Sequence, residues 1–127
     1  NSTHAQGSTK PAELLRDKLL SAGFPAADVK LLAPADKPSK GNLVVRYHGK
    51  GRAKPILFMG HLDVVEAKRE DWTRVPFKLI EEDGYFYGRG TFDDKAQAAI
   101  FTDGSPVFQT QDAFKGTVLA KYADSGW

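Results

Sequence analysis

The chain has 127 residues and a mass of 13.9 kDa, the size of a single domain. Hydrophobic residues make up 41% and charged residues 27%, which excludes a disordered or fibrous protein. The formal net charge of +2 is too small to favour nucleic acid as a partner, and no apolar run reaches the length of about 18 residues that a membrane helix needs. We therefore expect a soluble globular protein with neither nucleic acid nor a membrane as partner, in a compartment that the sequence does not indicate.

The first half of the chain predicts one helix and several short strands behind a polar amino end, residues 1–10, which we expect to be flexible. A helix is expected from Pro11 to Ala22, because Leu14, Leu15 and Leu19 fall on one stripe. Strands are expected at residues 29–32, 42–47 and 56–59. The last of these runs is continuously apolar, which is typical of a strand covered on both faces in a parallel or mixed sheet.

The second half predicts a hairpin, a glycine-rich turn and two helices. The hairpin has Asp83-Gly84 at its turn and strands at residues 78–81 and 85–87. Helices are expected at 93–101, where alanines predominate, and at 112–123, where apolar residues recur at helical intervals.

His61 and Asp63 follow the apolar strand at the edge where α/β folds bind ligands. Residues two apart in an extended chain point to the same side, so this imidazole and carboxylate can act together. A metal-binding His commonly has such a carboxylate partner, which fixes its orientation. The alternative is a structural histidine held by hydrogen bonds. Since the chain has no cysteine, His, Asp and Glu are the only strong metal ligands available to it.

A second group of charged residues, Asp93, Asp94 and Lys95, follows the turn Gly88-Arg89-Gly90 at the start of a predicted helix. Acidic residues in this position can serve as helix caps, favoured by the helix dipole, or as metal ligands. Taken alone, this group leaves both interpretations open.

The two groups together resemble a known family. The order His61-Leu62-Asp63, then Trp72, then Gly88-Arg89-Gly90-Thr91-Phe92-Asp93-Asp94-Lys95 is similar to that of the co-catalytic zinc peptidases and amidohydrolases, which include aminoacylase, carnosinase and succinyl-diaminopimelate desuccinylase. The resemblance implies an α/β fold, a truncated zinc-exopeptidase-like mixed sheet with flanking helices. It also implies divalent metal, Zn or Mn, as one ion or two, and a small-molecule substrate.

The resemblance also implies roles for single residues. His61 would be a metal ligand and Asp63 the catalytic carboxylate that orients it. Asp93 would bridge two metal ions, and a cis peptide bond would join it to Asp94. The resemblance ends near Ile100, so we expect a metallopeptidase-like core at 11–103 and a helical tail outside the family at 104–127.

The family's downstream Glu pair, which supplies the general base, is not found after Phe101. On this basis we expect a homodimer with a shared metal site, doubling His61 and Asp93, and a preference for phosphodiesters or other activated esters over peptides. Arg89 and Lys95 are the expected contacts to an anionic substrate. One alternative is amide or peptide hydrolysis with Asp94, Asp103 or Asp112 as substitute base. Another is an inactive metal-binding fragment or subunit.

Overall fold

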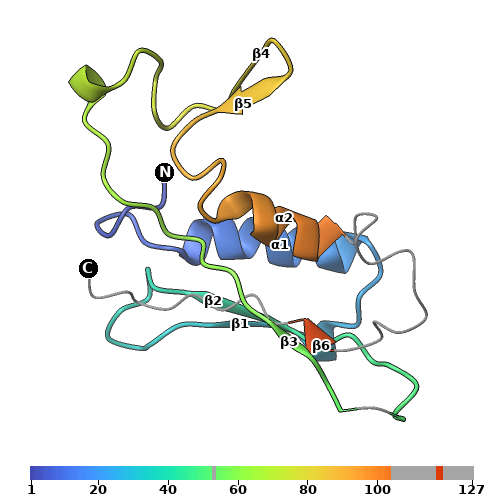
Figure 1. Cartoon of the computed structure of the whole chain (residues 1–127). Helices are drawn as coiled ribbons and strands as arrows, with labels where there is room; N and C mark the ends of the chain where they lie inside the picture. Colours follow the sequence, from blue (N-terminus) through green and yellow to red (C-terminus); the bar gives the residue numbers. More distant parts are fainter. Residues whose placement is uncertain (53, 104–116, 119–127) are drawn as a thin grey trace.

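The computed structural model describes residues 1–52 and 54–103, together with the backbone of 117–118. Two helices, α1 (Thr9–Ser21) and α2 (Lys95–Asp103), lie on the same face of a layer of short strands (Figure 1). Two single turns of 3-10 helix, η1 (Ala26–Asp28) and η2 (Arg69–Asp71), interrupt the connections. The fold is therefore of the α/β class, as the sequence predicts.

Helix α1 covers the predicted range, but the stripe that it buries differs from the predicted one. Ala12 and Leu19 are buried and Leu15 packs against the core, whereas Leu14 is 72% exposed. Residues at i, i+3 and i+7 share a helix face, so Ala12 rather than Leu14 is in phase with the other two. The small side chain of Ala12 is fully buried, an inward position that counting leucines alone did not find.

The amino end, which we expected to be flexible, packs against the rest of the chain in the structure. Ser2, Thr3 and Ser8 are buried. The hydroxyl of Ser8 donates to the Gly41 carbonyl at 2.8 Å, and that of Ser2 donates to the Leu62 carbonyl at 2.6 Å. Buried hydroxyls with hydrogen-bond partners are tolerated, so a polar composition did not exclude an ordered segment.

Four strands make up the layer beneath the helices. β1 (Val29–Leu32) pairs antiparallel with β2 (Asn42–Val45), and β3 (Leu57–Phe58) pairs in parallel with β6 (Thr117–Val118). β6 also contacts β2, so both ladders belong to one layer. Thr117–Val118 is thus a strand inside the segment that we expected to be helical. The rest of that segment lies outside the described residues.

The apolar run around β3 is not covered on both faces as predicted. Ile56, Leu57 and Met59 remain 43%, 53% and 58% exposed. β3 is two residues long, and the two helices that the structure describes lie on one face of the layer that contains it (Figure 1). The apolar composition therefore predicted the strand correctly, but not how much of its side chains is exposed.

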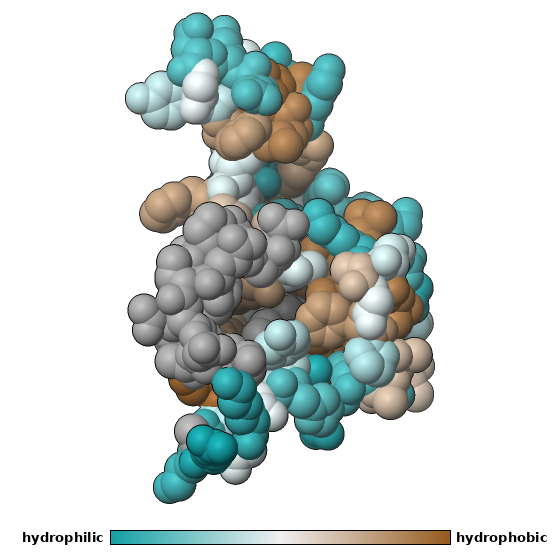
Figure 2. Space-filling model, turned by 90° about the vertical axis from the view of Figure 1, so that its right-hand side faces the viewer, coloured by the Kyte–Doolittle hydropathy of each residue, from teal (hydrophilic) through white to brown (hydrophobic). Residues whose placement is uncertain are grey.

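The hairpin of β4 (Ile80–Glu82) and β5 (Tyr85–Tyr87) projects from the two layers (Figure 1). Asp83 and Gly84 have φ of 52° and 78°, the conformation of a type I′ turn and the one that the sequence Asp-Gly favours. Hydrophobic side chains, among them the exposed Leu79 and Phe86, gather on the projecting part of the molecule (Figure 2).

The core lies between the helices and the β1–β2 pair. Its buried residues come from α1, β1, β2, α2 and the segment after β3: Ala12, Leu19, Val29, Leu43, Val45, Leu62 and Ala98. Leu62 directly follows His61, so the candidate site is attached to the core through its neighbour in sequence. In the part of the chain that the structure describes, no helix is both long and apolar enough to cross a membrane.

Candidate metal centre

The chain leaves β3 and continues, from His61 to Val64, with side chains that are alternately partly exposed and buried. Leu62 and Val64 are buried, at 2% and 6% exposure. His61 and Asp63 are partly exposed and line a cavity of about 580 Å³. This is the alternation that the spacing predicts, and it places the imidazole and the carboxylate on one side.

The imidazole of His61 lies between two carboxylates. Its Nδ1 is 3.1 Å from Asp63 Oδ1 and 3.2 Å from the Asp63 carbonyl oxygen, while its Nε2 is 2.8 Å from Asp93 Oδ1. The tertiary structure therefore brings together the two motifs that the sequence holds 30 residues apart.

These neighbours change the acidity of His61. Burial acts to lower its pKa, but the hydrogen bond to Asp93, the contact with the Asp63 carbonyl and the two carboxylate charges together raise the pKa above the ordinary value of 6.5. Each of the two ring nitrogens faces a carboxylate, and this arrangement favours the protonated imidazolium.

The peptide bond between Asp93 and Asp94 is cis, as the family resemblance predicts. The two carboxylates point to different places. Asp93 is 81% exposed at its side chain and lines the His61 cavity, whereas Asp94 Oδ2 accepts a hydrogen bond from the His61 backbone N–H at 3.3 Å. Gly60 makes room for it, since a Cβ there would lie 3.1 Å from Asp94 Oδ2. Asp94 thus supports the backbone of His61, and its catalytic role stays a prediction.

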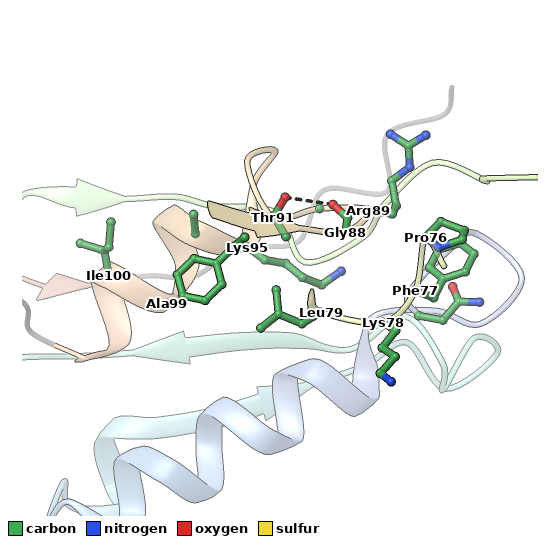
Figure 3. Close-up of a pocket in the computed structure, with 14 residues that line it drawn as sticks. Pro76, Phe77, Lys78, Leu79, Gly88, Arg89, Thr91, Lys95, Ala99 and Ile100 are labelled. Atoms are coloured by element: carbon green, nitrogen blue, oxygen red, sulfur yellow. Dashed lines mark hydrogen bonds between the residues drawn. The ribbon is translucent and has the colours of Figure 1, made fainter. Parts of the chain in front are cut away.

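The two expected anion contacts, Arg89 and Lys95, lie differently. Arg89 lines the His61 cavity, its guanidinium carbon 5.0 Å from the centre of the Trp72 ring. Lys95 lines not that cavity but a neighbouring, largely apolar cavity of about 500 Å³, which Arg89 also borders; in Figure 3 the Arg89 side chain points away from Lys95. Burial lowers the pKa of Lys95 against the opposing effect of Asp63. Their contact with a substrate stays a prediction for both residues.

The donor atoms present suit a divalent metal ion in part. His61 Nε2 and Asp93 Oδ1 face each other, and nitrogen with carboxylate oxygen is a ligand set for Zn or Mn. Asp63 at Nδ1 provides the outer partner that ligand histidines usually have. Among residues 1–52 and 54–103, however, no three His, Asp or Glu side chains are grouped so that they could hold an ion by themselves.

The remaining titratable candidates are not at this site. His48 is exposed and pairs with Asp28 at 2.9 Å, and His4 is exposed with its Nδ1 3.1 Å from Lys40 Nζ, so both lie at the surface. The side chains of Asp103 and Asp112, the other proposed substitute bases, lie outside the described residues.

Ser2 is the residue near the site that sequence reasoning missed. It contacts Leu62 and Val64 through hydrogen bonds, although about 60 residues separate them in sequence. A serine in a polar amino end carries no periodic or motif signal, so only the tertiary structure could reveal it.

Two solved structures share this fold. Human carnosine dipeptidase 1 matches 89% of the chain with a TM-score of 0.65 and 22% identity, and the dipeptidase Dug1p from Saccharomyces cerevisiae matches 91% with a TM-score of 0.64 and 24% identity. In each case the match covers 26% of the longer protein. The chain therefore has an α/β exopeptidase-like fold.

The profile of peptidase family M20/M25/M40 matches residues 57–120, and the chain belongs to this family. Succinyl-diaminopimelate desuccinylase from Roseobacter denitrificans is 40% identical over 84% of the chain, and acetylornithine deacetylase from Dictyostelium discoideum is 45% identical over 55%. The chain spans 27% and 17% of the length of these two relatives. The family resemblance read from the motifs is thus confirmed, and the match continues past Ile100.

The predicted preference for phosphodiesters over peptides is wrong. The relatives are named as a deacetylase and a desuccinylase and the family as peptidases, all of which cleave amide bonds. The prediction rested on the general base not found after Phe101. The chain spans only about a quarter of the length of these longer proteins, so the Glu not found in it says nothing about the reaction.

Proposed function

We propose that this chain carries part of the metal centre of an amide hydrolase that removes acyl groups from amino acids or cleaves peptides. The observation that carries the proposal is the His61 imidazole held between Asp63 and Asp93. The acyl–amino acid substrate class follows from the names of the relatives that are at least 40% identical, a deacetylase and a desuccinylase.

In this proposal His61 and Asp93 hold the metal ion, and Asp63 keeps the imidazole oriented through Nδ1. A bound divalent ion would polarise the amide carbonyl and lower the pKa of its bound water toward neutrality. Arg89 borders the same cavity and supplies a positive charge for a substrate carboxylate. Its indole neighbour, Trp72, limits the directions in which the guanidinium can move.

The two ligands proposed among the described residues are fewer than the three that a catalytic metal usually has. We further propose that a second copy of the chain supplies the others across a twofold axis, so that the site is shared in a homodimer. The exposed position of Asp93, at 81%, leaves its carboxylate accessible to such a neighbour.

Zinc titration by calorimetry tests the ligand assignment. We expect His61→Ala and Asp93→Asn each to weaken zinc binding at least about tenfold, because each removes a direct ligand. The matched control is His48→Ala, which breaks another exposed His–Asp pair, at 2.9 Å from Asp28, that lies outside the site. Equal zinc affinity in wild type and His61→Ala would refute the assignment.

The reaction is tested separately, with zinc-loaded protein and N-acetyl and N-succinyl amino acids as substrates. Release of acetate or succinate that disappears in His61→Ala and persists in His48→Ala supports an amide hydrolase. Tight zinc binding with no release from either substrate class would instead indicate the inactive metal-binding subunit.

A further inference from the structure

The segment before α1 reaches the metal centre through a single residue, Ser2, which is 1% exposed. Its hydroxyl donates to the Leu62 carbonyl at 2.6 Å, and its own carbonyl accepts a hydrogen bond from the Val64 N–H at 3.1 Å. These two bonds fix the backbone on both sides of Asp63, the residue whose carboxylate faces His61 Nδ1.

Lys95 completes the arrangement from helix α2. Its Nζ donates to Ser2 Oγ at 2.7 Å, and the Lys95 backbone N–H donates to the Gly90 carbonyl at 3.2 Å. A serine hydroxyl has one hydrogen to donate and lone pairs to accept, so both of its side-chain bonds can form at once. Ser2 therefore joins the loop that carries His61 to the helix that follows Asp93.

We propose that Ser2 is a positioning residue for the metal centre, and that its hydrogen bonds to Leu62, Val64 and Lys95 set the orientation of Asp63 against His61. This inference rests on the proposed metal-binding function. Ser2 touches neither the imidazole nor Asp93, so it acts through the backbone. Losing the hydroxyl would leave the Leu62 carbonyl buried without its partner and the loop free to shift.

The chain offers a matched control in Ser8. This serine is also fully buried, lies in the same segment, and donates one hydrogen bond to a backbone carbonyl, that of Gly41 at 2.8 Å. Ser8→Ala removes a comparable bond without contact with residues 61–64. Any effect of Ser2→Ala that Ser8→Ala does not reproduce is therefore specific to the metal centre.

The experiment measures cobalt affinity by absorbance titration in wild type, Ser2→Ala and Ser8→Ala, each confirmed as folded by its amide NMR spectrum. We expect binding about tenfold weaker in Ser2→Ala, the lower end of the effect of outer partners on metal sites, and unchanged in Ser8→Ala. Equal affinity in the two variants overturns the proposal. If Ser2→Ala does not fold, Lys95→Met replaces it, because it removes the ammonium that donates to Ser2 Oγ without adding a metal ligand.

A second measurement needs no metal. The imidazole ¹⁵N shifts of His61 in metal-free protein report its hydrogen bonds, and we expect them to change in Ser2→Ala but not in Ser8→Ala. Unchanged shifts in Ser2→Ala overturn the positioning role. If wild type fails to bind cobalt while these shifts do respond, the proposed metal function fails and the positioning of His61 by Ser2 stands.

Discussion

At the scale of single residues, Gly90 shows how closely the two motifs of the site pack. Its φ is +87°, and a Cβ at this position would lie 2.6 Å from Val64 Cγ1 and 3.3 Å from Lys95 Nζ. Only glycine combines this backbone conformation with such close approach. The turn that precedes Asp93 thus packs directly against the segment after β3 that contains His61 and Val64.

We expect Gly90→Ala to lower the free energy of unfolding by about 2–4 kcal/mol, because it adds an overpacked contact to a strained backbone conformation. Gly23→Ala is the control. Gly23 has nearly the same φ, +90°, with nothing within 4 Å, so this variant should lose only about 1–2 kcal/mol. Urea denaturation of both measures the difference, and equal losses would show that the Val64 contact relaxes without cost.

At the scale of elements, helix α1 is held by one narrow face. We expect Leu19→Ala to lower the free energy of unfolding by about 2–4 kcal/mol, because this side chain is 4% exposed and lies in the core. Leu14→Ala, the same chemical change on the same helix, should cost less than about 0.5 kcal/mol, since Leu14 is 72% exposed. Thermal unfolding followed by circular dichroism compares them. A large loss in Leu14→Ala would mean that another surface covers this face.

The hairpin illustrates an element that local sequence determines almost alone. Asp83-Gly84 sets the turn, and Arg74 attaches the hairpin to the preceding loop by donating to Glu82 Oε2 at 2.8 Å and lying 3.9 Å above the Tyr87 ring. The turn was predictable because positive φ at two successive residues favours this pair. The Arg74 contacts were not predictable. Glu82 and Tyr87 lie eight and thirteen positions after Arg74, and only the folded chain brings them together.

At the scale of the whole molecule, apolar side chains remain exposed beside the candidate metal centre. Met59, Val65 and Phe92 are 58%, 64% and 90% exposed, and Val65 and Phe92 line the cavity of His61. Exposed apolar groups around the two proposed ligands are what the shared-site proposal requires of a surface that a second copy covers.

Native mass spectrometry tests this proposal. We expect zinc-loaded protein to be a dimer and protein treated with EDTA to shift toward monomer, because the metal ligands come from both copies. Phe92→Ser should weaken the dimer, whereas Leu14→Ser, which removes an exposed apolar side chain from α1, should not. A monomer that retains zinc would contradict the shared site.

The sequence by itself determined the local elements, the family and the two motifs of the site. β1 falls on the predicted residues, α1 and the hairpin closely match their predicted ranges, and the cis bond occurs where the resemblance implies it. These features depend on neighbours in sequence: turn residues, periodicity and a long motif.

Only the tertiary structure decided which residues meet. It buried Ser2 against Leu62, turned Asp94 away from the cavity toward the His61 backbone, and placed Lys95 in a different cavity from His61. It also left Leu14 and the β3 run exposed. The physical reason is that burial and hydrogen-bond partners depend on contacts between distant segments, which the pattern of one segment does not encode.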